Sequence, residues 1–381
     1  MSALAGYKVI ELAGLGPAPM GCMMLADMGA EVIRIERPGA GDQTVLEPIS
    51  GRGKKSVVLN LKSAAGLETL LRLIDGADVI VDPYRPGVCE KLGFGPEVCM
   101  ARNPKLIFAR MTGWGQTGPL AHSAGHDINY IALTGALHAV GRPGEKPAIP
   151  LNLFGDMGGG GMLLVNGVLA ALLAAGRTGQ GQVVDVAMVD GAAQLMWMMQ
   201  AWQQQGIWND QDRGVNILDG GAHFYDTYTC ADGQYICIGS IEPQFYALLC
   251  QLMDLPADDF ADQHNQAKWP DMKAKLAGIF TTKSRDEWCA LMAGSDVCFA
   301  PVLRMSEAPE YPANKARDVY IDVGGMLHAA PAPRFSATPS RVQHPTHALG
   351  HDTVSTLAGC GFEDAEISAL LESGAIVQGA E

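Results

Sequence analysis

The sequence is short of positive charge. Among its 381 residues, 27 Lys and Arg stand against 41 Asp and Glu, which gives a formal net charge of −14. This acidity argues against a surface that binds nucleic acid or an anionic membrane, since both require a broad basic face. It leaves room for a local basic pocket that binds one anionic small molecule. With 48% hydrophobic and 18% charged residues, the composition is that of a well-packed globular protein.

Paired cysteines and familiar catalytic signatures are also missing. The nine cysteines are odd in number and include no C-x-x-C pair, which argues against a disulfide framework and a structural zinc site. No Gly-x-Ser-x-Gly, His-Glu-x-x-His or P-loop motif occurs. We therefore expect no metal site and a reducing, cytoplasmic environment.

Long hydrophobic runs are absent as well. The longest apolar stretch, Met162 to Ala175, contains Asn166 and is shorter than the roughly 18 to 20 residues that a membrane-spanning helix needs. We expect a buried core helix there. Neither end of the sequence matches a signal peptide or a targeting address, so we expect a soluble protein without a membrane partner.

The first third of the chain alternates strand-like and helix-like segments. Apolar runs predict strands at 7–12, 31–36, 77–82 and 106–111, with helices at 19–28 and 62–74 between them. This alternation predicts βαβ units and a parallel sheet, an α/β fold. Further helices are expected near 126–139, 157–176 and 190–204, with a strand at 182–189.

The second half of the chain has a different texture. Residues 206–224 are polar and rich in glycine, which is typical of a linker. A strand pair at 226–230 and 235–239 follows, and then helical segments. This order predicts a smaller α+β domain.

One motif imitates a dinucleotide-binding fingerprint. Gly14 and Gly16 follow the first strand and precede a helix, but Pro19 replaces the third glycine. That glycine allows close packing of helix on strand, whereas proline is comfortable in a first helical turn. We interpret the segment as a strand–turn–helix unit without a nicotinamide site.

Basic residues gather in the first quarter of the chain, several of them at strand ends, where open α/β sheets bind ligands. They are Arg34, Arg37, Arg52, Lys54, Lys55, Lys62, Arg85 and Lys91. In an acidic chain the cluster favours a polyanionic small molecule, although any single member can be an ordinary solvated charge.

Three titratable residues lie in unusual surroundings. His126 follows a loop at a predicted helix start, Asp156 is flanked by apolar residues and the run Gly158–Gly161, and Glu242 follows a strand of the smaller domain. A carboxyl group in an apolar setting can have its pKa raised toward neutrality, which suits general acid–base chemistry. Each residue also has an ordinary alternative role: a helix cap for Asp156 and His126, and a surface acid for Glu242.

Taken in order, these motifs resemble a known family. The chain is similar to the α-methylacyl-CoA racemases, within the family III CoA-transferase superfamily, over nearly its whole length. The matching segments are Val9–Gly14, Tyr84–Gly87, Lys91–Gly93, Arg110–Pro119, Gly125–Tyr130, Asn152–Asp156, Val184–Met188, Leu218–Gly221, Tyr225–Tyr228, Ile241–Phe245 and Pro331–Ser336.

The resemblance implies an interlocked homodimer with two domains in each chain. A large Rossmann-like CoA-binding domain would comprise 1–200, completed by 325–381, with a linker at 201–224 and a small α+β domain at 225–324. The active site would lie between the large domain of one subunit and the small domain of the other. CoA is expected to be bound by Arg37, Lys54, Lys55, Asn60, Leu61, Lys62, Tyr84, Arg85, Lys91 and Gly125. The family often has arginine at the position of Lys91, and lysine lacks the bidentate fork.

The resemblance also implies a reaction in lipid metabolism. (R)- and (S)-2-methylacyl-CoA thioesters would interconvert by removal of the α-proton and its return on the opposite face, through an enolate. By resemblance, His126, oriented by Glu242, serves one face, and Asp156, bonded to Asn152, serves the other. The backbone N–H around Asp127 would stabilise the enolate oxygen. No cofactor is expected, because CoA is part of the substrate.

Two alternatives remain open. A CoA-transferase of the same superfamily would use Asp156 as its nucleophile and would not need His126 and Glu242. A catalytically silent CoA-binding scaffold would need none of the three.

Overall fold

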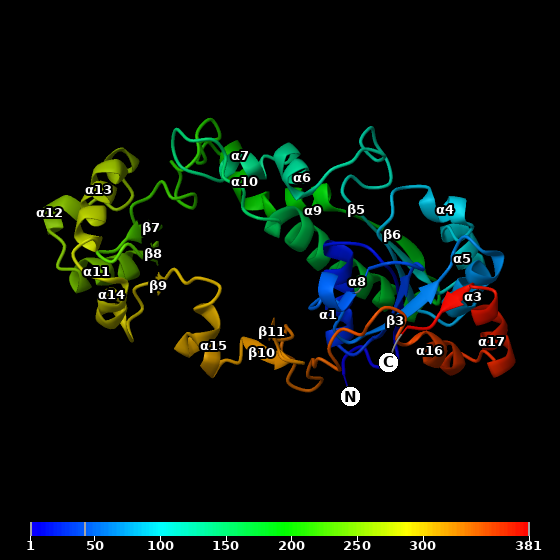
Figure 1. The fold of residues 1–381 in the computed structure, drawn as a ribbon. Coiled ribbons are helices and arrows are strands. Elements are labelled where there is room, and N and C mark those ends of the chain that lie inside the picture. Colours follow the sequence, from blue (N-terminus) through cyan, green and yellow to red (C-terminus); the bar gives the residue numbers. More distant parts are fainter. Residues whose placement is uncertain (1, 42, 380–381) are drawn as a thin grey trace. The chain divides into compact units, whose positions relative to one another are not determined.

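A computed structural model describes residues 2–41 and 43–379, and the chain divides into two compact units. The first unit comprises Met1–Thr134, Leu151–Met196 and Val319–Glu381, and the second comprises Gly135–Pro150 and Trp197–Asp318. Residues 135–150, which we placed in the large domain, thus group with the second unit. The last of these three segments belongs to the first unit because the chain returns at its C-terminal end to the sheet on which it began (Figure 1).

A seven-stranded sheet forms the first unit, in the order β12-β3-β2-β1-β4-β5-β6. The strands are β1 (Lys8–Leu12), β2 (Glu31–Glu36), β3 (Lys54–Leu59), β4 (Val79–Asp82), β5 (Ile107–Thr112), β6 (Gln182–Ala187) and β12 (Ile376–Val377). All neighbours pair in parallel except β12, which is antiparallel to β3. β1 pairs with both β2 and β4, so the strand order reverses there. The predicted α/β class is confirmed.

Helices cover both faces of this sheet. They are α1 (Pro17–Asp27), α2 (Gln43–Leu46), α3 (Ala64–Asp75), α4 (Val88–Leu92), α5 (Pro96–Arg102), α6 (Asp127–Leu133), the π-helix η1 (Leu153–Met162), α8 (Leu163–Thr178), α9 (Met188–Leu195), α16 (Thr353–Gly359) and α17 (Asp364–Glu372). Strand residues alternate between the two cores. Ile10 belongs to the core that contains Leu70 of α3, and Val9 to the core that contains Leu25 of α1 and Val168 of α8. Burial on both faces explains why apolar residues predominate in these strands.

The longest helical stretch joins η1 to α8. Leu153–Thr178 is the one helix among the described residues that is long and apolar enough to cross a membrane, and 44% of its most apolar window is buried. Its inner face contributes Val165 and Val168 to the core, while Leu173 is exposed. A core helix passes the same test of length and composition, so this feature is weak evidence for a membrane span.

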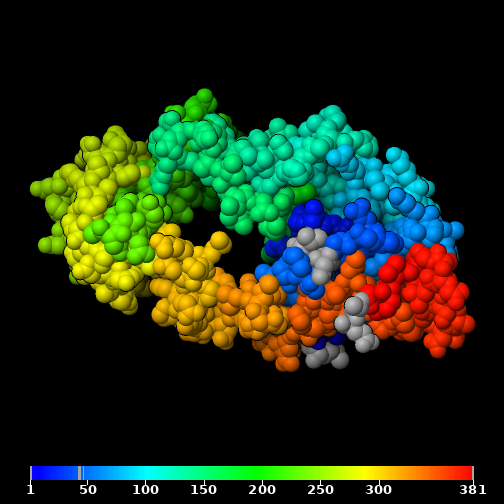
Figure 2. Space-filling model, viewed as in Figure 1, coloured from blue at the N-terminus to red at the C-terminus, as the bar shows by residue number. Residues whose placement is uncertain are grey.

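The C-terminal segment closes the sheet edge. β12 pairs Ile376 with Leu59 of β3, and Val58 donates its backbone N–H to the hydroxyl of Thr353 at 3.1 Å. In Figure 2 the red C-terminal residues pack directly against the blue N-terminal part of the same unit. The first unit is therefore completed by residues from both ends of the chain.

The second unit has its own antiparallel sheet and its own core. The sheet contains β7 (Tyr225–Thr229), β8 (Tyr235–Gly239) and β9 (Phe299–Pro301). Its helices are α7 (Ala136–Ala139), α10 (Trp197–Gln204), α11 (Pro243–Leu252), α12 (Ala257–Phe260), η2 (Gln266–Lys268), α13 (Trp269–Phe280), α14 (Arg285–Met292), η3 (Ala308–Glu310) and α15 (Pro312–Ala316). A separate hairpin, β10 (Tyr320–Val323) and β11 (Met326–Ala329), begins the last segment of the first unit.

The segment predicted as a linker is an ordered loop. Asn216 is buried, accepts the backbone N–H of Asn209 at 2.8 Å and donates from its amide to Asp219 at 2.8 Å. A polar composition that is typical of a linker here satisfies the hydrogen bonds of the loop itself.

Candidate active site

Two cavities lie where the strand order of the first unit reverses. β1 ends at Leu12 and β4 at Asp82, and the chains that follow them diverge, which opens a crevice at the carboxyl ends of the strands. One cavity, of about 540 Å³, is lined by His126 among others, and we name it the His126 cavity. The second, of about 800 Å³, is lined by Arg37 among others, and we name it the Arg37 cavity. Gly14, Leu15 and Tyr84 line both, so the cavities adjoin.

His126 stands at the start of α6. It is the residue before the first helical turn, and its backbone N–H donates to the side-chain oxygen of Asn129 at 3.0 Å. The residue is exposed, and it lines its cavity together with Gly125 and Tyr130. This position presents an imidazole at the wall of the cavity, as a general acid or base requires.

Asp127 links α6 to η1. It is buried, and its Oδ1 accepts two backbone N–H groups, from Gly155 at 2.6 Å and from Asp156 at 2.7 Å. Among the described residues its Oδ2 has no hydrogen-bond partner. We predicted a role only for the backbone of Asp127; the structure adds a side chain that fixes Asp156 relative to the residue beside His126.

Asp156, in η1, is half-buried and lies against the turn between β1 and α1. Its Oδ2 accepts a hydrogen bond from the amide of Asn152 at 3.1 Å, the predicted contact. A Cβ on Gly16, which has a φ of 71°, would lie 3.6 Å from the same oxygen. Burial raises the pKa of Asp156, and the charge of Asp127 raises it further, against the opposing effects of Asn152 and His126. His126 and Asp156 are thus within electrostatic reach of each other.

The four glycines after Asp156 allow close packing. A Cβ on Gly159 would lie 2.7 Å from the backbone nitrogen of Ala192 in α9, and one on Gly160 would lie 2.8 Å from the Cβ of Pro17 in α1. η1 therefore packs closely between α1 and α9, and there is no room for a side chain at Gly159 or Gly160. π-Helical turns are frequent at functional sites, and this one carries Asp156 at its fourth position.

The Arg37 cavity has the chemistry of an anion site. Arg37 follows β2, and Asn60, Leu61 and Lys62 follow β3, so the cavity lies beyond the carboxyl ends of neighbouring strands. Arg37 is exposed. Burial raises the pKa of Tyr84 to about 12, which keeps its hydroxyl neutral between the two cavities. Two cations beside backbone at strand ends suit a phosphorylated ligand.

Three residues that we expected to bind CoA lie elsewhere. Lys54 is buried, with its Nζ 2.6 Å from Glu11 and donating to the carbonyl of Pro19 at 2.9 Å. Lys55 pairs with Glu31 at 2.6 Å. Neither of them lines the His126 or Arg37 cavity, and Lys91, exposed on α4, lines neither either. The two lysines at the start of β3 both pair with carboxylates from other strands of the same sheet, Lys54 with β1 and Lys55 with β2.

Two arginines of the basic cluster have structural partners as well. Arg34 is 2.8 Å from Glu47 and 3.3 Å from Glu36. Arg52 pairs with Asp27 at 2.6 Å, and both are buried. Arg85, in contrast, is exposed and lines the His126 cavity. Arg34 also lines the Arg37 cavity but is paired with carboxylates, so the cations left for a ligand, Arg37, Lys62 and Arg85, are those that follow strand ends.

Glu242 belongs to the second unit. It precedes α11 and is exposed. Its predicted pairing with His126 stays a prediction. The same unit has a cavity of about 490 Å³ lined by Arg142, Tyr225 and Asp226 among others, and Arg142 contacts Asp226 at 2.6 Å.

An aromatic pair that we did not single out walls the His126 cavity. The rings of Trp114 and Tyr130 meet edge to face with centroids 4.8 Å apart, and the Tyr130 hydroxyl donates to the carbonyl of Gly125 at 2.5 Å. Within the described part of the chain, the buried indole N–H of Trp114 has no acceptor. The Gly–Trp–Gly sequence at 113–115 was the available signal, since both glycines at 113 and 125 leave room for these rings.

Known families and proteins are similar to this chain over most of its length. CoA-transferase family III matches residues 4–353. A mouse protein named alpha-methylacyl-CoA racemase is 46% identical over 96% of this chain and 95% of its own length, and the human protein of that name is 44% identical with the same coverage. The crystal structure of a CAIB/BAIF family protein from Brucella suis aligns with a TM-score of 0.82 and 26% identity, over 94% of this chain and 99% of that one.

Proposed function

The chain belongs to CoA-transferase family III, and we propose that it is an acyl-CoA racemase. It would interconvert (R)- and (S)-2-methylacyl-CoA thioesters by moving the α-proton from one face of the carbon to the other. The observation that carries the proposal is that His126 lines a cavity that adjoins the Arg37 cavity, while Asp127 beside it holds the backbone of Asp156, whose pKa responds to the charge of His126. Close similarity to proteins named alpha-methylacyl-CoA racemase supports it.

The two adjoining cavities divide the substrate. The nucleotide end of CoA would occupy the Arg37 cavity, with Arg37 and Lys62 facing its phosphates. The pantetheine arm would pass Tyr84, which lines both cavities, and deliver the thioester to the His126 cavity. Arg85 lines this second cavity and offers a further cation along the path. Binding energy gathered along CoA then holds the α-carbon where the proton is transferred.

Racemisation requires an acid and a base on opposite faces of the α-carbon. One group, His126 or the Asp156 carboxylate, takes the proton, and the electron pair of the C–H bond moves into the enolate of the thioester. The other group, in its protonated form, returns a proton to the opposite face. Burial, which raises the pKa of Asp156, brings this carboxyl group closer to the neutral range where it can serve in both directions.

The enolate oxygen needs a donor that is already oriented. Asp127 is the first residue of α6, and its backbone N–H lies at the positive end of that helix. We assign this N–H the stabilisation of the developing negative charge. The side chain of Asp127 acts differently, as a positioning group that holds the backbone of Asp156.

The active enzyme is proposed to be an interlocked homodimer in the cytoplasm, with no added cofactor and no membrane partner. Glu242, from the small domain of one copy, would orient His126 in the other. Several large apolar side chains of the first unit are exposed, which supports burial against a second copy. They are Leu133, Leu151, Leu153, Met162 and Leu173.

The test uses one epimer of a 2-methylacyl-CoA in deuterated water, with no acyl acceptor. Epimerisation with deuterium uptake at the α-carbon is the expected result. No exchange, together with CoA transfer that begins only when a free carboxylate is added, would overturn the proposal in favour of a transferase with Asp156 as nucleophile.

Variants separate the two chemistries further. His126→Ala and Asp156→Ala should each abolish epimerisation in a folded protein. His122→Ala is the matched control, because His122 is exposed in the same loop and lines neither cavity. Near-normal turnover in either of the first two variants contradicts the two-base assignment.

A further inference from the structure

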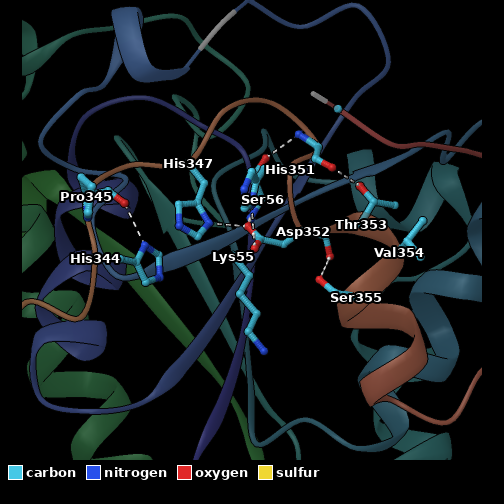
Figure 3. Close-up of polar contacts among 12 residues, drawn as sticks. Lys55, Ser56, His344, Pro345, His347, His351, Asp352, Thr353, Val354 and Ser355 are labelled. Carbon is cyan, nitrogen blue, oxygen red and sulfur yellow. Dashed lines mark hydrogen bonds and ion pairs between the residues drawn. The ribbon is translucent and has the colours of Figure 1, made fainter. Parts of the chain in front are cut away.

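A cluster of imidazoles surrounds one buried carboxylate far along the chain from the residues of the active site. His347 Nδ1 lies 2.8 Å from Oδ2 of Asp352, and His351 Nδ1 lies 3.1 Å from Oδ1 of the same group. Figure 3 shows the ring of His347 pointing at this carboxylate, immediately before α16. Both oxygens of Asp352 are thus engaged by imidazole nitrogens.

Asp352 is held rigidly by the sheet. Its Oδ2 also accepts the backbone N–H of Ser56 in β3 at 2.8 Å, and its own backbone N–H donates to the carbonyl of Ser56 at 3.0 Å. The Ser56 hydroxyl in turn accepts the N–H of Gly350 at 2.8 Å.

The histidine rings are fixed as well. His344 stacks on His347 with ring centroids 3.9 Å apart and an angle of 20° between the planes. Its Nδ1 lies 2.8 Å from the carbonyl oxygen of Pro345. His347 and His351 approach each other with centroids 4.3 Å apart. The donors are therefore oriented before any ligand arrives, which reduces the entropy that binding would cost.

The spacing of the donor atoms fits a metal ion. One ligand atom from each of His347, His351 and Asp352 lies within 4.8 Å of the others. Two ligands of a tetrahedral site, each at about 2.0–2.1 Å from Zn²⁺, would be about 3.3 Å apart. The nitrogen–oxygen separations of 2.8 and 3.1 Å are hydrogen bonds to the two oxygens of Asp352, so an ion would replace the imidazole protons and the ligands would move apart by a few tenths of an ångström.

We propose that His347, His351 and Asp352 form a binding site for a divalent transition-metal ion, of the Zn²⁺, Ni²⁺ and Cu²⁺ class. Two imidazoles and one carboxylate suit these ions and do not suit Mg²⁺ or Ca²⁺, which prefer oxygen ligands. Solvent fills the remaining positions, because His347 and His351 are partly exposed. The proposal departs from our expectation of no metal, which rested on the absence of paired cysteines and of a His-Glu-x-x-His motif.

The site is separate from the proposed chemistry. None of the three ligands lines the His126 or the Arg37 cavity. The nearest cation in Figure 3, Lys55, leads away from the cluster and is paired with Glu31. The ion would have a structural role, because it would link the segment before α16, through Ser56, to the strand β3. Metal binding should therefore stabilise the docking of the C-terminal segment on the sheet.

The experiment measures Zn²⁺ binding to the full-length protein after treatment with a chelator. Titration calorimetry should give one Zn²⁺ per chain, no response to Mg²⁺ under the same conditions, and a higher melting temperature with Zn²⁺. His347→Gln and His351→Gln should each weaken Zn²⁺ binding by at least tenfold, the scale on which even outer partners of metal ligands matter. His122→Gln, an exposed histidine outside the cluster, is the matched control and should bind as the wild type does.

The choice of variants keeps the proposal open to refutation. An Asp352 variant is avoided, because that side chain also holds Ser56 and its loss can unfold the C-terminal segment. Both glutamine variants are checked for an unchanged melting temperature without metal. Binding that is equal in wild type and in both variants, or no Zn²⁺ binding up to 100-fold excess over the protein, overturns the site.

Discussion

Replacement of Asp127 by asparagine tests how the two proposed bases are coupled. Asparagine keeps an oxygen for the backbone N–H groups of Gly155 and Asp156 but removes the charge that both bonds rely on. A hydrogen bond to a charged group contributes about 1.5–3 kcal/mol and a neutral one about 0.5–1.5 kcal/mol. Over two bonds the loss is therefore about 1–3 kcal/mol, spent in the segment that carries Asp156.

The same substitution changes the ionisation of Asp156. The charge of Asp127 helps burial to raise the pKa of Asp156, so its removal lowers that pKa. If the carboxylate of Asp156 takes the proton, the rate rises with pH as this group ionises. The acidic limb of the kcat profile should therefore move to lower pH in Asp127→Asn. The raised pKa of Asp156 also affects stability. A pKa that is raised in the folded state stabilises the fold at low pH, and this contribution disappears as the pH rises through that pKa.

The assay is α-deuterium exchange at a series of pH values. At the plateau, kcat should fall about 5- to 150-fold, which corresponds to about 1–3 kcal/mol, while KM changes little because Asp127 lines neither cavity. Asp185→Asn is the matched control: Asp185 also accepts a backbone N–H, from Gln116 at 2.9 Å, but it is exposed and does not contact η1. An unchanged kcat and an unmoved acidic limb in Asp127→Asn would refute the coupling.

Three further variants test the packing and the ligand site. Lys54→Met should lower the free energy of unfolding by about 3–5 kcal/mol, because it removes the cation 2.6 Å from buried Glu11 and leaves only Arg34, 3.8 Å away, whereas Lys55→Ala, which breaks an exposed pair, should change it by at most about 1 kcal/mol; equal melting temperatures contradict this. Gly159→Ala should destabilise by about 1–3 kcal/mol through overpacking, while Gly176→Ala in α8, where no atom lies within 4 Å of a new Cβ, should stabilise by about 0.5–1 kcal/mol. Arg37→Ala should raise KM for the CoA thioester by about 10- to 100-fold, the value of a charged hydrogen bond, and leave kcat unchanged; a loss of kcat at constant KM would place Arg37 outside the CoA site.

The central strands of the sheet could be predicted because they are buried on both faces. β1, β2, β4 and β5 are rich in buried apolar residues, and they lie at the predicted positions within one or two residues. β3 was missed because it begins with two lysines. Lys54 is tolerated inside through Glu11 of β1 and the carbonyl of Pro19, partners more than thirty positions away that no local pattern reveals.

The helices near the site were predicted with the wrong boundaries. The stretch 126–139 reads as one helix, but Gly135, at a φ of 83°, ends it, and α7 belongs to the second unit. The stretch 157–176 begins earlier, as a π-helix whose packing against α1 and α9 requires the glycine run. Local helix propensity does not predict these boundaries, because tertiary contacts set them.

The candidate site divides in the same way. His126 and Asp156 were found because imidazole and carboxyl groups in such surroundings suit proton transfer. The side chain of Asp127 was not, because its role depends on contact with residues almost thirty positions away. The imidazole cluster was missed for a different reason: its three ligands span only six positions, but only paired cysteines and the His-Glu-x-x-His motif were considered as metal signals.

The basic residues show why charge in a sequence indicates that an anion site exists without locating it. Lys54 and Arg52 contact buried carboxylates at 2.6 Å, and Arg34, itself buried, lies 2.8 Å from Glu47 and 3.3 Å from buried Glu36, so their charge is consumed within the fold. In an acidic chain with many interior carboxylates, burial claims the cations in the middle of strands first. A cation remains available to a ligand where the strand has ended and the side chain reaches solvent, as Arg37 and Lys62 do. The position of a basic residue relative to the carboxyl end of its strand is thus a better guide to the CoA site than the density of basic residues around it.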